Sequence, residues 1–245
     1  MTSRGAIQPP SREAEIRAGL AAVRGRIAAA CRAVGREPAE VRLVAVTKTF
    51  PASDVRIAAG LGVRDVGENR DQEARGKAAE LGDLPLSWHF VGQLQRNKCA
   101  SVARYAAVVH SLDRPGVIDA LASGAQRAGR TVVGLVQVDL DVRPRPAGGR
   151  GGAHPAEVPE LAERIADSPG LRLGGVMAVA PLGEDPAEAF ARLRGIADDL
   201  AGHYPDAAMI SAGMSGDLES AIAAGATHVR VGTAVFGNRP PMLLG

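Results

Sequence analysis

Short apolar runs rich in β-branched residues alternate eight times with alanine-rich helical stretches along this sequence. Several of the helical stretches begin with Asp, Ser or Pro and end at Gly, as capped helices do. This alternation predicts a parallel sheet with crossover connections, and the nearly continuous apolar strands predict burial on both faces. The predicted strands are VRLVAVTK (41–48), VRDVGEN (63–69), SWHFVG (87–92), AAVVHSL (106–112), TVVGLVQVDL (131–140), LRLGGVMAVA (171–180), AAMISAG (207–213) and THVRVGT (227–233).

The number of these units favours a closed (β/α)8 TIM barrel over an open sheet. The chain has 245 residues, and barrels of this kind usually have about 250. An open doubly wound sheet would permit the same alternation. However, the residues after the first predicted strand, VTKTFPAS, lack the glycine cluster of a dinucleotide-binding fold. We therefore expect an α/β fold with a single barrel.

The segments outside the barrel pattern define the expected domain organisation. Residues 1–10 are predicted to be a flexible N-terminal tail, and residues 11–245 a single barrel domain. Apolar residues three or four apart predict an extra N-terminal helix from Arg12 to about Val34, with Ser11 as its N-cap. The run RPRPAGGRGGAHP (143–155) breaks the rhythm, and we interpret it as a mobile loop after the fifth strand.

The composition argues against several classes of protein. The 29 basic and 27 acidic residues are interspersed and leave a net charge of +2, and only 3% of residues are aromatic, so we expect no nucleic-acid partner. No apolar run approaches the roughly 18 residues of a membrane helix, and no signal peptide is recognisable, which predicts a cytoplasmic protein with no membrane partner. Two cysteines without CxxC spacing and five scattered histidines predict neither a disulfide framework nor a metal site.

Lys48 stands at the end of the first predicted strand, and active sites of barrels lie at the C-terminal ends of their strands. Partial burial of a lysine lowers the pKa of its amine and makes the neutral amine available as a nucleophile. Such an amine forms a Schiff base with an aldehyde. The alternative is an ordinary strand-end lysine whose ammonium group reaches water. The position of Lys48 alone favours the ordinary strand-end lysine at least as much as a lysine that forms a Schiff base.

The second and third predicted strands also end in polar residues. Asn69 offers a donor and an acceptor to the same barrel mouth, or else caps the following helix. His89 is interpreted as a satisfied core residue rather than a general base or a ligand. This interpretation rests on the lack of a second histidine or carboxylate at metal-ligand spacing.

The loops after the seventh and eighth predicted strands indicate an anion site. Barrels commonly bind phosphate there, because glycines let the backbone approach and helix N-termini supply free N–H groups. Ser211, Ser215 and Thr233 add hydroxyl donors, and Arg230 adds a fixed charge. The alternative is tight turns and helix caps without a ligand, but two such loops favour phosphate. Together with Lys48, they fit a phosphorylated aldehyde, of which pyridoxal 5′-phosphate (PLP) is the commonest cofactor.

Five stretches of the sequence together resemble a known family. They are VAVTKTFP (44–51), GENRDQE (67–73), WHFVGQLQRNK (88–98), GGVMAVAP (174–181) and ISAGMSGDLESAIAAGATHVRVGTAVFG (210–237). The family is that of the YggS/PROSC pyridoxal phosphate homeostasis proteins. Because the stretches occur in order and in register over most of the chain, the resemblance is specific.

The resemblance implies a barrel like the N-terminal domain of alanine racemase. It implies that Lys48 carries PLP as a Schiff base and that Arg230 faces the pyridine nitrogen. The implied cofactor-binding residues are Lys48, Asn69, Ser211, Met214, Arg230, Gly232 and Thr233. No catalytic residue and no metal ligand is implied beyond this set.

The resemblance also implies a function, namely a PLP carrier in intracellular vitamin B6 homeostasis without robust turnover. Its expected partners are PLP and PLP-requiring apo-enzymes, and its expected state is a monomer or weak homodimer. The alternative is a PLP-dependent amino-acid racemase or a related fold-type III enzyme, which would need a second acid/base group opposite the lysine. Tyr105 and Tyr204 are predicted at the N-terminal face, away from that position. A Schiff-base aldolase without PLP is a third possibility.

Overall fold

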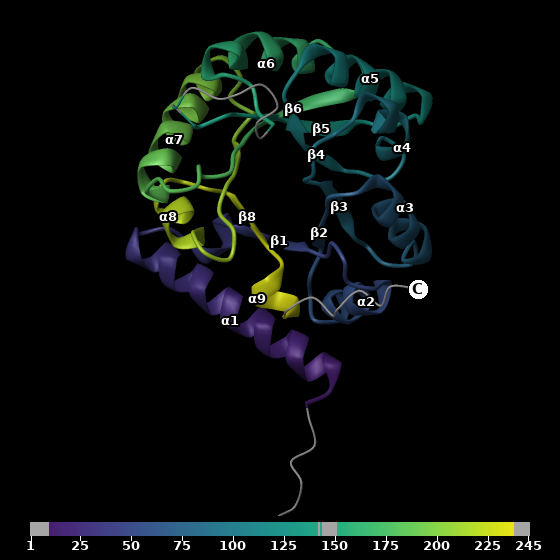
Figure 1. Cartoon of the computed structure of the whole chain (residues 1–245), viewed down its shortest axis with the longest axis vertical. Helices are drawn as coiled ribbons and strands as arrows, with labels where there is room; N and C mark the ends of the chain where they lie inside the picture. Colours follow the sequence, from purple (N-terminus) through teal and green to yellow (C-terminus); the bar gives the residue numbers. More distant parts are fainter. Residues whose placement is uncertain (1–9, 142, 144–150, 238–245) are drawn as a thin grey trace, which may run out of the picture.

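The computed structural model describes residues 10–141, 143 and 151–237, and within them eight parallel strands form a closed barrel. Each strand pairs with the next along the chain, and β8 pairs with β1 to close the ring (Figure 1). The strands are β1 (Arg42–Val46), β2 (Asp65–Glu68), β3 (Ser87–Phe90), β4 (Val108–Leu112), β5 (Val132–Gln137), β6 (Leu171–Met177), β7 (Met209–Ser211) and β8 (His228–Val231). The predicted (β/α)8 TIM barrel is therefore confirmed.

Helices surround the barrel as an outer layer (Figure 1). The α-helices of the described residues are α1 (Arg12–Ala33), α2 (Ala52–Gly60), α3 (Asp71–Glu80), α4 (Cys99–Val102), α5 (Pro115–Arg127), α6 (Val158–Ala166), α7 (Pro186–His203), α8 (Leu218–Ala223) and α9 (Thr233–Phe236). Short 3-10 helices lie at η1 (Pro38–Glu40), η2 (Arg96–Lys98) and η3 (Pro155–Glu157). None of the helices in the described part of the chain combines the length and the apolar character needed to cross a membrane.

The extra N-terminal helix covers the outside of the barrel where β8 meets β1 (Figure 1). The helix after β8, α9, has only four residues, so it cannot cover this part of the sheet alone. Helix α1 packs against it, and a side chain at Gly19 would collide with the backbone oxygen of Val235. The predicted N-cap is confirmed, because Ser11 Oγ accepts the N–H of Ala14 at 3.2 Å.

All eight strands are shorter than predicted, by residues at one or both ends. Strand β1 ends at Val46, two residues before Lys48, and β8 ends at Val231. Thr233 begins α9 instead of ending a strand. Between β3 and β4 the chain forms only η2 followed by the four-residue helix α4. The apolar runs of the sequence continue beyond the strands into the loops. Composition therefore does not show at which residue the backbone hydrogen bonds between strands end.

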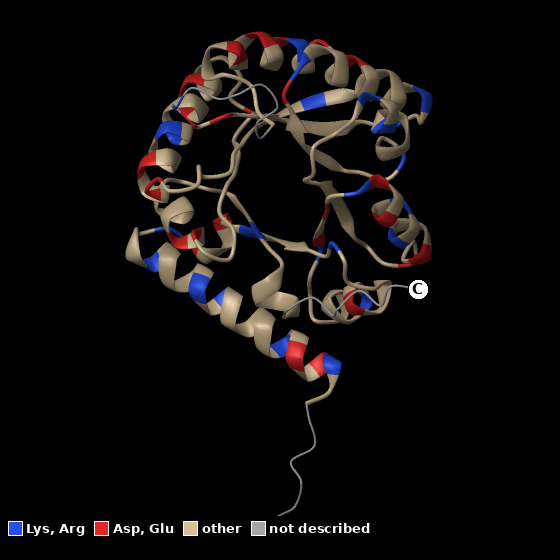
Figure 2. Cartoon of the chain, in the orientation of Figure 1, with Lys and Arg blue, Asp and Glu red and all other residues tan. Residues whose placement is uncertain are grey.

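The barrel wall separates two kinds of interior. Between the strands and the outer helices lie two large apolar clusters, which include Val66, Val109 and Val229. Because side chains alternate along a strand, the neighbours of these residues point into the barrel. On the β4–β6 side the inner space holds a small apolar cluster around Leu135. Charged residues lie mainly on the outer helices, where both signs alternate (Figure 2).

The loop predicted over residues 143–155 is described at residue 143 and from residue 151 onward. Its second part is attached to the barrel, because Ala153 forms a β-bridge with Val138 and the Gln137 amide donates to the Gly151 carbonyl at 2.5 Å. Residues 144–150 and residues 1–9 of the predicted tail lie outside the described residues. The predictions of mobility for these segments stay predictions.

Candidate functional site

A cavity of about 420 Å³ lies at the C-terminal ends of the strands, where the barrel fold places its active sites. Its size is typical of a small-molecule site. The residues that line it are Val46, Lys48, Phe50, Asn69, Val91, Met177, Val179, Met214, Ser215, Gly216, Arg230, Gly232 and Thr233. The structure thus brings six of the seven predicted site residues to one cavity. The seventh, Ser211, is fully buried and does not line it.

Lys48 is partly buried at the cavity, on the loop between β1 and α2. Among the described residues, no hydrogen bond or ion pair involves its amine. The amine is therefore not committed to a protein partner and can react with a molecule in the cavity. This is the arrangement that a nucleophilic lysine requires.

The backbone on both sides of Lys48 is held by a buried charged cluster on α3 and β2. Lys77 donates to the carbonyl oxygen of Thr47 at 2.8 Å and to Glu68 and Glu73 at 2.7 and 2.6 Å. Glu73 also accepts the N–H of the residue after Lys48, Thr49, at 2.7 Å. Thr49 has a φ of 70°, a strained conformation for a β-branched residue that persists only when its surroundings impose it.

Arg230 reaches the cavity from inside β8 and is almost completely buried. Its Nη1 donates to Ser211 Oγ at 2.7 Å and its Nη2 to the Ala178 carbonyl at 2.8 Å. Burial lowers the pKa of Arg230 to about 10, and Asp217 partly opposes this effect. No ion pair between described residues includes Arg230, and both of its hydrogen-bond acceptors, Ser211 Oγ and the Ala178 carbonyl, are neutral. A buried cation without a carboxylate partner favours a ligand with an anionic or electron-rich group.

The loops after β7 and β8 form one side of the cavity. A side chain at Gly232 would place its Cβ 2.9 Å from the Val46 carbonyl oxygen, so glycine lets the two backbones approach here. Gly213 turns the β7 loop with a φ of 89°, and Asp217 Oδ1 then accepts the N–H of Met214 at 2.6 Å. Thr233 is exposed at the start of α9, with its hydroxyl not bonded to any described residue. This side of the cavity therefore offers small residues and free hydroxyl donors.

Three histidines inside the barrel were not recognised as a group from the sequence. His89, His110 and His228 come from three strands, and the rings of His89 and His110 lie 5.1 Å apart between centroids. The expectation that His89 is a satisfied core residue agrees with its hydrogen bonds to His110 and Asp65 and a longer one, of 3.4 Å, between its Nε2 and Ser87 Oγ. Only the register between the strands brings these rings together, and the sequence does not reveal that register.

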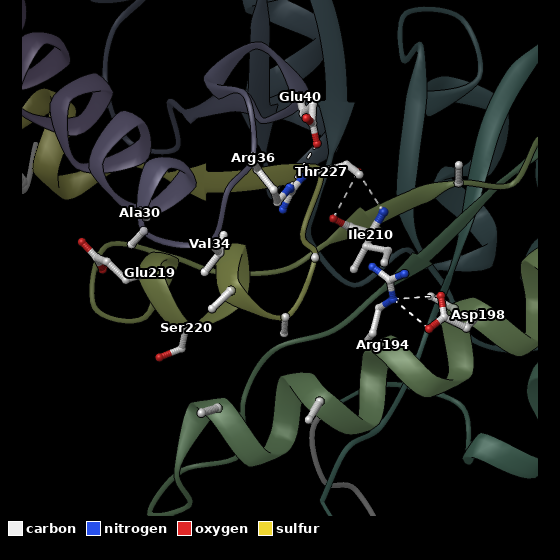
Figure 3. A pocket seen from close by; sticks show the side chains of 18 of the residues that line it. Ala30, Val34, Arg36, Glu40, Arg194, Asp198, Ile210, Glu219, Ser220 and Thr227 are labelled. Carbon is white, nitrogen blue, oxygen red and sulfur yellow. Dashed lines mark hydrogen bonds and ion pairs between the residues drawn. The ribbon is translucent and has the colours of Figure 1, made fainter.

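A larger cavity, of about 1320 Å³, is a different feature between α1, α7 and α8 (Figure 3). It is lined mainly by alanines, and its charged side chains are already paired. Arg36 bonds to Glu40 and to two backbone carbonyls, and Arg194 bonds to Asp198. Because it presents no uncommitted reactive group, this groove is not the candidate site.

The chemistry of the smaller cavity fits PLP. An uncommitted amine, a buried guanidinium without a carboxylate, and a glycine-rich wall with hydroxyls match an aldehyde, a ring acceptor and a phosphate. Of the described residues that line the cavity, none is Asp, Glu, His, Cys or Tyr. No group of three or more possible metal ligands occurs in the residues that the structure describes.

Comparisons with known proteins identify the family of the chain. The family model for "Alanine racemase, N-terminal domain" matches residues 19–240. A pyridoxal phosphate homeostasis protein of Mycobacterium tuberculosis is 43% identical over 94% of this chain and 95% of its own length. One from Pseudomonas aeruginosa is 46% identical over 90% of this chain and 94% of its own. The structure of PipY from Synechococcus elongatus, with PLP bound, superposes with a TM-score of 0.76 and 36% identity, covering 91% of this chain and all of PipY.

Proposed function

The chain belongs to the family of pyridoxal phosphate homeostasis proteins, which is built on the alanine racemase N-terminal domain, and we propose that it binds PLP and serves vitamin B6 homeostasis. We propose further that Lys48 carries PLP as a Schiff base. The observation that carries this proposal is that the uncommitted Lys48 amine and the buried Arg230 guanidinium line the same cavity. Bound PLP supplies an aldehyde carbon that exchanges between amines.

Each side of the cavity has a separate task in this proposal. Arg230 donates to the pyridine nitrogen, with its orientation held by Ser211 and Ala178. Gly232 and Thr233 hold the phosphate, since a free hydroxyl and an unhindered backbone suit an anion. Asn69 and Met214 line the wall between these parts. Ser211 contributes through Arg230, because its hydroxyl already contacts Arg230 and His110.

A carrier without robust turnover is favoured over a racemase. Racemisation needs a second acid or base on the face of the cofactor opposite the lysine. The described cavity residues offer only Lys48 and Arg230 as titratable groups. Tyr105 and Tyr204 precede β4 and β7 at the other end of the barrel, and neither lines the cavity. An arginine at the pyridine nitrogen also disfavours protonation of the ring, which weakens PLP as an electron sink.

The finer parts of the proposal concern partners and location. We assign PLP-requiring apo-enzymes as recipients of PLP and a monomer or weak homodimer as the working state. A cytoplasmic location is supported by the two cysteines, Cys31 and Cys99, which are buried and free.

The carrier and racemase functions are separated by one experiment. The protein is loaded with PLP, freed of excess cofactor and incubated with L-alanine and L-serine while optical inversion is followed. The proposal expects retained PLP with turnover well below about 1 s⁻¹, the lower end of ordinary enzyme rates. Inversion above that rate would support the racemase, and a protein that retains no PLP would contradict both functions.

A further inference from the structure

A continuous chain of hydrogen bonds crosses the inside of the barrel from Arg230 to Asp65. Arg230 Nη1 contacts Ser211 Oγ at 2.7 Å, and Ser211 Oγ contacts His110 Nδ1 at 2.9 Å. His110 Nε2 lies 2.8 Å from His89 Nδ1, and His89 Nε2 lies 3.0 Å from Asp65 Oδ1. We call these five residues the interior chain. It connects the cavity to the N-terminal end of β2, which begins at Asp65.

The two ends of the interior chain determine its direction. A guanidinium only donates, so Ser211 accepts from Arg230. At the other end, burial acts to raise the pKa of Asp65, but the hydrogen bond from His89 leaves it below its ordinary value. Asp65 is therefore an acceptor at neutral pH, and His89 carries its proton on Nε2.

The remaining protons are placed by the neutral state of His110 and by the contacts between the rings. Burial holds the pKa of His110 well below its ordinary value, so this ring is neutral. With a single ring proton on His89, donated from Nε2, its Nδ1 accepts, and His110 must then carry its proton on Nε2. His110 Nδ1 in turn accepts the hydroxyl proton of Ser211. Every donor in the interior chain then has an acceptor, and all bonds point from Arg230 toward Asp65.

The opposite direction would leave one buried donor unsatisfied. If both rings carried their protons on Nδ1, His110 and Arg230 would both donate to Ser211 Oγ. The hydroxyl proton of Ser211 would then have no acceptor among the described residues. Ser211 and His110 have no exposed surface, so bulk water does not reach them. An unmet buried donor is costly, and this cost favours the direction that Asp65 sets.

We propose that Asp65 is a positioning residue that orients Arg230 across the barrel by fixing the ring protons of His89 and His110. This proposal rests on the assignment of the cavity to PLP. With Ser211 free to accept, the guanidinium is held by Ser211 and by the Ala178 carbonyl, and its remaining N–H groups are available to the cavity. A carboxylate at the opposite end of the barrel therefore controls how firmly PLP is retained.

The direction is tested in the ligand-free full-length protein, with 15N-labelled histidine. Nitrogen chemical shifts distinguish protonated from unprotonated ring nitrogens, and His89→Gln and His110→Gln variants assign the signals. We expect both rings of the wild type to carry the proton on Nε2. In Asp65→Asn the amide can donate to His89 Nε2, so we expect the ring protons to move to Nδ1. Wild-type rings protonated on Nδ1, or rings that do not respond to Asp65→Asn, would overturn the proposal.

A matched control separates this effect from loss of a buried charge. Asp54 is also buried and ionically bonded, but it lies on α2 and pairs with Arg12 outside the barrel interior. The Asp54→Asn substitution makes the same chemical change and should leave both ring signals unchanged. If Asp54→Asn moves the same signals, the proposed route through the barrel is wrong.

The link to PLP is tested by the apparent dissociation constant, measured by equilibrium dialysis. Asp65→Asn and Ser211→Ala should each raise it about tenfold, the effect of weakening one charge-assisted hydrogen bond. Because both substitutions interrupt one chain, the double variant should resemble either single variant. The positioning role would be overturned if the two increases in the dissociation constant multiplied in the double variant. It would also be overturned if the constant were unchanged in both single variants.

The results also distinguish this proposal from the proposed function. Should the wild type fail to bind PLP while its ring protons lie on Nε2, the proposed function is wrong, and Asp65 has no cofactor to act on. Should the wild type bind PLP and Asp65→Asn fail to fold, the wild-type ring signals still test the direction. Ser211→Ala, a small change in volume, then tests the link to Arg230.

Discussion

Lys77 donates a hydrogen bond from Nζ to the backbone carbonyl of Thr47 at 2.8 Å, directly before the lysine of the site. The same ammonium group bonds to two carboxylates, those of Glu68 and Glu73. Helix α3 thereby fixes the loop that presents Lys48. Lys77 is thus structural, whereas Lys48 is placed to react with a molecule in the cavity.

We predict that Lys77→Met destabilises the protein by about 3 kcal/mol or more, the usual cost of breaking a buried ion pair on one side. Burial already raises the pKa of Glu68, and Lys77 opposes this rise. Without Lys77, Glu68 must take up a proton or remain an unpaired buried charge. Urea unfolding of the variant and the wild type measures the difference.

The control for this prediction is Lys98→Met, which removes a lysine from an exposed position. Its free energy of unfolding should change by less than about 0.5 kcal/mol. The loss in Lys77→Met should shrink at acidic pH, where Glu68 is protonated in the folded and unfolded states alike. An equal loss at both pH values would show that packing, and not charge, explains the effect.

A second prediction uses two glycines that line the same cavity. Gly232→Ala would bring a Cβ to 2.9 Å from the Val46 carbonyl oxygen, whereas Gly216→Ala meets no atom within 4 Å. We expect Gly232→Ala to lower the free energy of unfolding by about 1–3 kcal/mol and to weaken PLP binding. Gly216→Ala should preserve stability. Equal stability of the two variants would contradict the close approach of β8 and β1.

A third prediction concerns the two hydrogen bonds that the guanidinium group of Arg230 donates. Arg230→Lys keeps the charge but offers one nitrogen, which cannot bond to both Ser211 Oγ and the Ala178 carbonyl as the guanidinium does. We expect PLP affinity to fall about tenfold or more. Arg194→Lys, on the outer helix α7, is the control and should leave the affinity unchanged. An Arg230→Lys variant with wild-type affinity would remove Arg230 from the site.

The stability of the protein should depend on pH through His228. Burial lowers the pKa of His228 from 6.5 to about 4, with the nearby His89 acting in the same direction. Between these two values the unfolded chain binds this proton and the folded protein does not. Stability from this group is therefore complete above pH 6.5 and is lost as the pH falls toward 4, by about 1.4 kcal/mol per pH unit.

His228→Gln tests this dependence, because it removes the titrating group. Its free energy of unfolding, measured by urea at several pH values, should fall less steeply below pH 6.5 than that of the wild type. His203→Gln removes an exposed histidine and serves as the control. The prediction fails if the slope for His228→Gln equals that of the wild type.

Periodicity and caps were sufficient to predict the barrel, the extra helix α1 and the strand ends that form the cavity. These features depend on local patterns, such as the helical spacing after Ser11 and the apolar run before Lys48. Because every barrel places its strand ends at one mouth, Lys48, Asn69, Arg230 and Thr233 meet there without any knowledge of register. The other two predicted residues at this cavity, Met214 and Gly232, were implied only by the family resemblance.

Other features depend on contacts between distant strands and were not predictable. The pairing of β7 with β8 brings Ser211 next to Arg230. In this position the Ser211 hydroxyl also contacts His110. The contact of His89 with His110 depends on the register of β3 against β4. The role of Lys77 was not recognised from the sequence, since only the folded position of α3 brings it to Thr47.

The central claim, that Lys48 binds PLP covalently, is tested most directly by mass spectrometry after reduction with borohydride. We predict that the wild type gains the mass of one reduced PLP group, located on the peptide that contains Lys48. Lys48→Ala should remain folded by circular dichroism and gain no such mass. An adduct on another lysine, or a wild-type mass that does not change after incubation with excess PLP and borohydride, would contradict the account.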